Sequence, residues 1–301
     1  MKRLKLLFVL FAVLAPVLSS LACVIPERLS DLDIRVPTID VVDEQEERHS
    51  FPLAGSEPAE VDIAFGAGVL ELEAGAPDDL LSGTFRYNVA QWAPEFQHEG
   101  SRLTIRQGGD EGRWGVPSGR VRNRWHLALS PQVPLHLNLR AGAGEGELDF
   151  THLQVASLDV NVGAGSFAVR FGEPNRGVME HLNLDTGASR ITLDGVGNAS
   201  PDTMRLQGGV GEMSVDLTGA WARSAEVQVR AGAGALSVRL PENVGVEVEV
   251  RKGVANVEAY GLRQMGSTYT NDRFGETEIE LSIDIVAGVG SVRLEVEGAL
   301  E

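Results

Sequence analysis

The chain repeats a unit of two short segments of alternating apolar residues around a glycine turn, and this repeat limits the fold more than any other feature. The unit reads "LDVNVGAGSFAVRF" at 158–171. Related segments lie at 61–75, 135–150, 182–195, 204–219, 225–240, 246–261 and 281–296. From Gly144 the third turn position recurs at Gly165, Ser189, Gly211, Gly234 and Ala255, a spacing of 21 to 24 residues. A period of this length is typical of stacked-repeat proteins.

The alternation within each unit predicts β-strands. In the unit at 158–171, Leu158, Val160 and Val162 lie on one face, and Asp159 and Asn161 lie on the other. A period of two residues is the strand period. Apolar residues make up 43% of the chain and aromatic residues only 6%, so Val, Leu, Ile and Ala supply the predicted core. Two arrangements fit: hairpins of a β-sandwich, or coils of a β-solenoid.

The composition of the turns favours the solenoid. Two-residue hairpin turns prefer Asn-Gly or Asp-Gly, and few of these turns contain either. Glycine at one position of every turn is expected if the turns stack, because strands about 4.8 Å apart leave little room for side chains at each level. The predicted structural turn glycines are Gly66, Gly68, Gly142, Gly144, Gly163, Gly165, Gly187, Gly209, Gly211, Gly232, Gly234, Gly253, Gly288 and Gly290. We therefore predict an all-β fold, a parallel β-solenoid of single-stranded coils.

The first 23 residues have the pattern of an export signal. Lys2, Arg3 and Lys5 precede an apolar run at 6–22, and the only cysteine, Cys23, follows it. The residues before Cys23 resemble the lipobox of bacterial lipoproteins, which predicts lipidation of Cys23, a signal or anchor helix and an exported, membrane-anchored protein. An uncleaved membrane anchor and free secretion are the alternatives, since the run is about long enough to span a bilayer.

The remaining chain divides into three predicted regions. Residues 24–56 are acidic and lack apolar periodicity, which predicts a flexible tether, with a capping strand in 33–42 as the alternative. Residues 57–134 hold one repeat unit and less regular strands, and are expected to form an irregular N-terminal cap. Residues 135–301 form the repeat region. Its long interruption at 261–280 is interpreted as a polar loop that seals the last coils, or as a binding loop.

Several kinds of chemistry find no support in the sequence. A net charge of −17 argues against nucleic acid as a partner. The glycine turns precede strands rather than helices, so they do not match phosphate-binding loops, and no cofactor is predicted. Carboxylates beside glycines at 108–112 and 142–149 lack the calcium-binding nonapeptide period, and the six histidines are dispersed, so no metal site is predicted. No catalytic residues stand out, and a polysaccharide-active β-helix enzyme stays as a remote alternative.

One basic segment stands out in this acidic chain. The segment at 108–125 clusters Arg113, Trp114, Arg120, Arg122, Arg124 and Trp125. Arginine and tryptophan are enriched at recognition hot spots. The cluster is therefore a candidate patch for docking an anionic wall polymer, a lipid headgroup or an acidic partner such as an envelope protein. The alternative is a solvated loop whose arginines pair with neighbouring acids.

These features together resemble the toast-rack, or adhesin-like, domains of bacterial envelope proteins. The segment at 124–171 is similar to the core of that family in order and spacing, and the segment at 61–89 is similar to its N-terminal part. Related domains form the C-terminal part of cell-wall-active-antibiotic response proteins. The resemblance implies a right-handed parallel β-solenoid. It offers no family catalytic residues to carry over.

The expected function is that of a non-enzymatic surface protein of the cell envelope. The solenoid would present a face to a protein or a wall polymer, and its open ends allow self-association. The alternative is an envelope-stress module that acts with a membrane partner. The multi-helix membrane segment of the antibiotic-response proteins is not found in this sequence.

Overall fold

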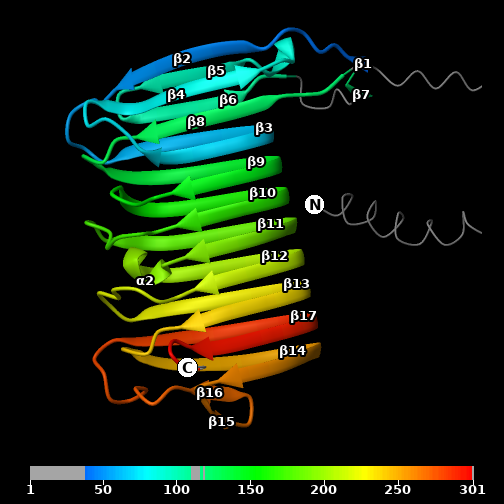
Figure 1. Ribbon diagram of the computed structural model, residues 1–301. Coiled ribbons are helices and arrows are strands. Elements are labelled where there is room, and N and C mark those ends of the chain that lie inside the picture. The colour runs from blue at the N-terminus through cyan, green and yellow to red at the C-terminus, as the bar shows by residue number, and fades with distance from the viewer. Residues whose placement is uncertain (1–37, 110–115, 118, 300–301) are drawn as a thin grey trace, which may run out of the picture. The chain divides into compact units, whose positions relative to one another are not determined.

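A computed structural model describes residues 38–109, 116–117 and 119–299 of the chain (Figure 1). The chain forms two compact units. The short strands β1 (Thr38–Ile39) and β7 (Val116–Pro117) pair in a two-stranded sheet of their own. Everything below concerns the larger unit, from residue 40 onward. The predicted signal segment, Cys23, Arg113 and Trp114 lie outside the described residues.

The larger unit is built on one 15-stranded sheet, most of whose strands are parallel. Eight long strands, here called rungs, form its body and correspond to the eight repeat units. They are β3 (Ala59–Ala74), β9 (Pro134–Asp149), β10 (Gln154–Arg170), β11 (Met179–Asp194), β12 (Pro201–Asp216), β13 (Ala225–Leu240), β14 (Gly245–Tyr260) and β17 (Glu280–Val296). The prediction of an all-β repeat fold is confirmed, while the handedness of the coil stays a prediction.

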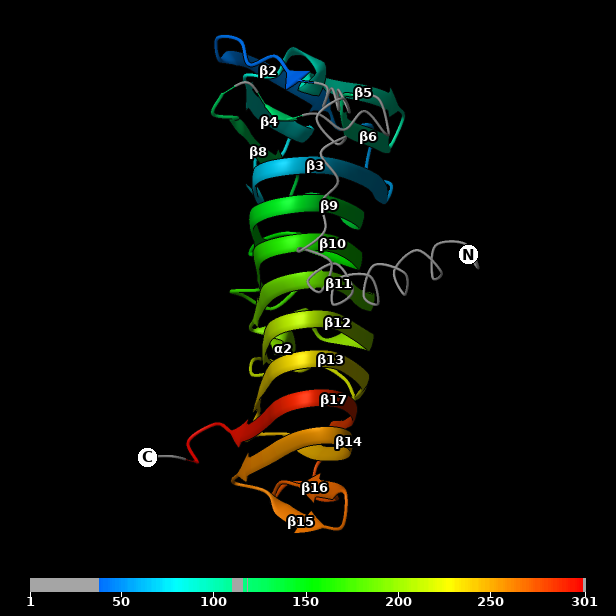
Figure 2. The same ribbon diagram turned by 90° about the vertical axis from the view of Figure 1, so that its right-hand side faces the viewer.

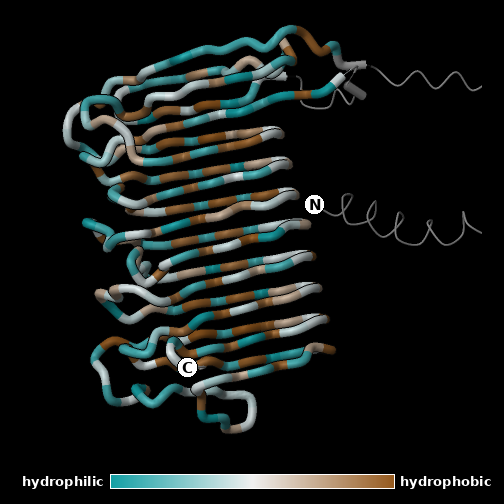
Figure 3. The backbone as a smooth tube through the Cα atoms, viewed as in Figure 1, coloured by the Kyte–Doolittle hydropathy of each residue, from teal (hydrophilic) through white to brown (hydrophobic). Residues whose placement is uncertain are grey.

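Each rung bends at its glycine turn into a first and a second arm, and the bends stack above one another (Figure 2). In β10 the first arm buries Leu158, Val160 and Val162, and the second arm buries Phe167 and Val169. Both sets belong to a single apolar core, which runs from rung to rung between the two arms. Apolar stretches therefore recur at corresponding places in successive rungs (Figure 3). The predicted inward faces of the repeat are confirmed.

The turns stack in strict register, and this explains their glycines. Gly165 of β10 pairs with Gly144 of β9, and its φ of +131° lies in a region that L side chains rarely adopt. A Cβ on Gly165 would overlap the carbonyl oxygen of Gly144, and one on Gly163 would overlap that of Gly142. The repeated glycines thus let one turn lie directly on the next.

The two ends of the stack are built differently. At the N-terminal end, the two arms of β3 have different partners. The second arm of β3 pairs with β8 (Asn123–Leu129), which is followed in the sheet by β4 (Asp79–Tyr87) and β2 (Gln45–Pro52). The first arm of β3 pairs with β6 (Arg102–Gln107), which in turn pairs with β5 (Pro94–Glu99). A short helical turn, η2 (Ala90–Trp92), precedes β5. The predicted cap region thus contains β3, which is a regular rung in register with β9.

At the C-terminal end, the last rung in the sequence is not the last rung of the stack. Strand β17 lies between β13 and β14, in parallel register with both. The segment between β14 and β17 forms the short strands β15 (Arg263–Met265) and β16 (Thr268–Thr270), and β16 pairs with 247–249 of β14. This segment therefore covers part of the outer edge of β14. A four-residue helix, α2 (Val196–Ala199), joins β11 to β12.

The expectation of a tether over 24–56 is wrong for residues 45–52, which form β2. This strand pairs antiparallel with β4 and half-buries Phe51, whose ring lies 5.2 Å from that of Phe96. The Tyr87 hydroxyl donates a hydrogen bond to Glu47. Burial and this bond raise the pKa of Tyr87 to about 12. An edge strand tolerates the polar residues that suggested a tether, because only one face of it meets the core.

Candidate functional site

The predicted arginine–tryptophan patch is not one surface in the structure. Trp125 is fully buried, with its ring 5.2 Å from that of Phe65 and 5.1 Å from that of Phe85. The alternation of β8 places Trp125, Leu127 and Leu129 inward together. Trp125 is therefore a core residue, and the expectation that it docks a partner is wrong.

The arginines that follow the loop meet acids instead of an open surface. Arg122 pairs with Glu44 at 3.1 Å, and Arg124 pairs with Glu71 at 3.0 Å. Arg120 is exposed, and its carbonyl accepts a hydrogen bond from Asn88. Among the described residues, the Arg122 and Arg124 charges are thus already balanced, which is the alternative that the sequence left open.

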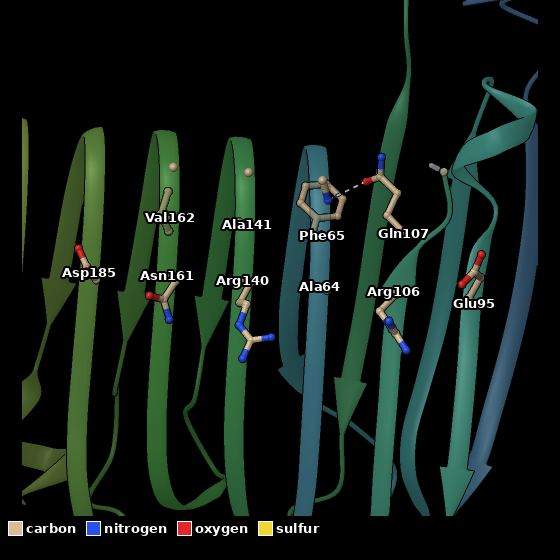
Figure 4. A pocket seen from close by; sticks show the side chains of 14 residues that line it. Ala64, Phe65, Glu95, Arg106, Gln107, Arg140, Ala141, Asn161, Val162 and Asp185 are labelled. Carbon is tan, nitrogen blue, oxygen red and sulfur yellow. Dashed lines mark hydrogen bonds between the residues drawn. The ribbon is translucent and has the colours of Figure 1, made fainter. Parts of the chain in front are cut away.

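A hollow lies elsewhere, on the outer face of the first arms. It is an open depression of about 740 Å³ (Figure 4). Its lining comes from the β5–β6 hairpin and from four successive rungs, β3, β9, β10 and β11. Outward residues of neighbouring strands stand in one row across it, in the order Arg106, Ala64, Arg140, Asn161 and Asp185.

Two cations of this row make no ion pair with a described residue, although Glu95 on β5 stands opposite Arg106. Arg106 and Arg140 are exposed, and neither side chain makes a hydrogen bond or an ion pair with another described side chain or backbone group. Ala64 stands between them, so their Cα atoms are two strand spacings, about 10 Å, apart. The small side chain of Ala64 leaves the space between the two guanidinium groups open (Figure 4).

A second, smaller hollow of about 220 Å³ adjoins the depression at these residues. Ala64, Arg106 and Arg140 line both hollows, and Asp62, Thr104 and Asn138 complete the polar lining of the smaller one. Asn138 donates a hydrogen bond of 2.9 Å to Asp62. The Thr104 hydroxyl makes no hydrogen bond to the described residues.

Gln107 fixes the wall of the depression nearest the turns. Its Oε1 accepts hydrogen bonds from the N–H groups of Gly66 and Ala67, at 2.9 and 3.2 Å, and from the side-chain amide of Asn123 at 2.7 Å. The glycine turn of β3, the strand β6 and the strand β8 are thereby tied together. Since Gln107 follows Arg106 directly, this network also fixes where Arg106 leaves the backbone.

The arrangement suits binding better than acid–base chemistry. The carboxylates that line the larger depression are Glu95 on β5 and Asp185 on β11, which are five strand spacings, about 24 Å, apart. Glycoside cleavage needs two carboxyl groups within about 10 Å. The described residues contain no cluster of three or more His, Cys, Asp or Glu side chains that could hold a metal.

Sequence reasoning missed this depression, although the alternation alone places Arg106 and Arg140 on outer faces. What it lacked was the pairing of β6 with the first arm of β3, which brings Arg106 beside Ala64 and Arg140. No helix in the described part of the chain is both long and apolar enough to cross a membrane.

A family model and several solved structures are similar to this chain. The family model described as the N-terminal domain of toast_rack, DUF2154, matches residues 40–179 and 174–239. A search of curated proteins finds no match. A solved structure of a provisionally named cell adhesion protein from Clostridium sporogenes is similar, with 23% identity, a TM-score of 0.49, and coverage of 84% of this chain and 100% of that one.

Two further solved structures are similar at lower identity. One is a provisionally named adhesin from Bacteroides fragilis, with 11% identity, a TM-score of 0.40, and coverage of 85% of this chain and 99% of that one. The other is a provisionally named lipid binding protein from Parabacteroides distasonis, with 14% identity, a TM-score of 0.40 and the same coverage.

Proposed function

The chain belongs to the toast-rack family, and from this premise we propose that it is a non-enzymatic surface protein of the cell envelope that binds an extended anionic polymer of the wall. In this proposal the stack is a right-handed β-solenoid held outside the cell by its N-terminal segment, with Cys23 as the lipid-bearing residue. The polymer lies along the row of first arms, in the depression between the β5–β6 hairpin and β11.

The observation that carries the proposal is the extent of the depression. It crosses four successive rungs and the neighbouring hairpin, and it is open to solvent along that path. A hollow of this form suits a ligand that is extended along the stack rather than a compact molecule, since compact ligands favour enclosed pockets. Glu95 and Asp185 also line the depression, so its charge is uneven rather than positive throughout. Arg106 and Arg140, which make no ion pair with the described residues, favour negative charge at their end of it.

The proposal is tested by filling the depression. In the full-length protein, Asn161→Trp places a bulky side chain on β10 in the middle of the polymer's path. We expect it to lower the affinity for isolated anionic wall polymer, measured by co-sedimentation, by about tenfold or more, because an overfilled contact costs about 1–3 kcal/mol. The matched control is Gln207→Trp, an exposed residue of the same row on β12, which is expected to change nothing.

Two results would count against the proposal. One is a wild-type protein that does not sediment with any anionic wall polymer. The other is an equal loss of binding in both tryptophan variants, which would place the contact outside the depression. Unchanged circular dichroism spectra of both variants show that the outer-face substitutions leave the fold intact.

A further inference from the structure

The small hollow between Arg106 and Arg140 has the features of a binding site for one anionic group. Its rim holds the two unpaired guanidinium groups, and the Ala64 methyl group between them leaves the space free. The strand pairing holds the backbone of both arginines in place: Arg106 through β6 on β3, and Arg140 through β9 on the other edge of β3. The distance between their Cα atoms is therefore set by the sheet rather than by a mobile loop.

The formal charge of this hollow matches a singly charged group. Arg106 and Arg140 contribute two positive charges, and Asp62 contributes one negative charge that is partly satisfied by the Asn138 amide. The net charge of the lining is thus one positive. A phosphodiester carries one negative charge, whereas a phosphomonoester carries about 1.5 to 2 at neutral pH and would leave charge unbalanced.

The donors of the hollow suit a tetrahedral group better than a planar carboxylate. One carboxylate is satisfied by a single arginine in a bidentate pair. Here two guanidinium groups come from the strands on either side of Ala64, and the unpaired Thr104 hydroxyl offers a third donor from the neighbouring position of β6. A group with oxygens directed to several sides can accept hydrogen bonds from all three.

We propose that Arg106, Arg140 and Thr104 form a binding site for a phosphodiester group of the polymer, seated over Ala64. This inference rests on the proposed function, since the larger depression carries the polymer onward from the same two arginines toward Asn161. Its occupant is a polymer of phosphodiester-linked units rather than a lipid headgroup, because the depression continues as an open path over β9, β10 and β11.

The site is tested with Arg106→Gln and Arg140→Gln in the full-length protein. The probes are glycerophosphoglycerol, a short soluble phosphodiester, and poly(glycerol phosphate), both measured by calorimetry. Each variant is expected to lower the affinity for both probes by about tenfold to a hundredfold, as expected for one hydrogen bond to a charged group. The matched control is Arg230→Gln: Arg230 lies in the same row on β13, outside both hollows, and has no ion pair among the described residues.

Three further probes identify the ligand. Polygalacturonate, a carboxylate polymer, and inorganic phosphate are expected to bind more weakly than the phosphodiester probes. Phosphatidylglycerol vesicles offer the same diester on a membrane and are expected to bind more weakly than poly(glycerol phosphate). Stronger binding of polygalacturonate would overturn the preference for a tetrahedral group, and stronger binding of inorganic phosphate would overturn the preference for a single charge. Stronger binding of the vesicles would overturn the choice of a polymer over a lipid headgroup.

The outcomes separate the site from the proposed function. If Arg106→Gln and Arg140→Gln bind poly(glycerol phosphate) as wild type does while Asn161→Trp does not, the phosphodiester site is wrong and the polymer-binding function stands. If glycerophosphoglycerol binding depends on both arginines while Asn161→Trp leaves polymer binding intact, the site stands and the path along the depression is wrong. If Arg106→Gln and Arg140→Gln lose no more affinity than Arg230→Gln does, the effect is one of net charge alone and the proposed site is wrong.

Discussion

Replacing Gly165 with alanine is expected to lower the free energy of unfolding by about 4 kcal/mol, a large share of the stability of an ordinary domain. Two costs add. The φ of +131° strains any L side chain, at about 1–3 kcal/mol. The new Cβ also overlaps the carbonyl oxygen of Gly144 in the neighbouring rung β9, and relieving an overpacked contact costs about 1–3 kcal/mol.

The matched control is Gly177→Ala, because a Cβ at Gly177 meets no atom within 4 Å. Its expected effect lies within about 0.5 kcal/mol of zero. Urea unfolding followed by circular dichroism measures both variants. A Gly165→Ala protein as stable as Gly177→Ala would contradict the account that the glycines exist to let the turns stack.

Replacing Trp125 with alanine is expected to lower the free energy of unfolding by about 3–5 kcal/mol. The indole is fully buried and packs edge-on against Phe65 and Phe85, so its removal leaves a large cavity between β3, β4 and β8. This result separates the two interpretations of Trp125. Replacing a docking residue would weaken binding and leave the free energy of unfolding unchanged. Replacing a core residue lowers the free energy of unfolding.

Trp92→Ala is the matched control, since Trp92 lies only partly buried on the short η2 turn. Its expected cost is below about 1 kcal/mol. Thermal unfolding of the two variants beside wild type measures the difference. Equal midpoints for Trp125→Ala and wild type would show that the indole is not part of the core.

The regular part of the fold could be predicted because its signal is local and repeated. The alternation around each turn assigns Leu158, Val162 and Phe167 to the core, and all three are buried. One repeat alone would be ambiguous between a hairpin and a coil. The recurrence of the turn at intervals of 21 to 24 residues favours coils, because identical units must stack to bury their apolar faces.

The ends of the stack could not be predicted from the same signal. Strand β2 looks like a tether because its residues are mostly polar, and only its pairing with β4 reveals Phe51 as a contact of the core. The position of β17 between β13 and β14 is equally hidden, since its sequence fits any rung. Pairing partners at the ends depend on the three-dimensional packing rather than on the repeat.

The candidate site was missed for a related reason. Arg106 and Arg140 belong to different kinds of segment, an irregular cap strand and a regular rung, and are 34 residues apart in the sequence. Only the sheet brings them to either side of Ala64. The arginine–tryptophan cluster looked stronger because its residues are close in sequence. The alternation of β8 points Trp125 inward and Arg124 outward, which divides that cluster.

Hydrogen–deuterium exchange of the full-length protein with and without poly(glycerol phosphate) tests most directly the claim that the outer face of the first arms is the functional surface. The account predicts slower exchange in the β5–β6 hairpin and in the first arms of β3, β9, β10 and β11, with no change in the second arms. Protection confined to the segment at 119–125 or to the second arms would contradict it, as would no protection at saturating polymer.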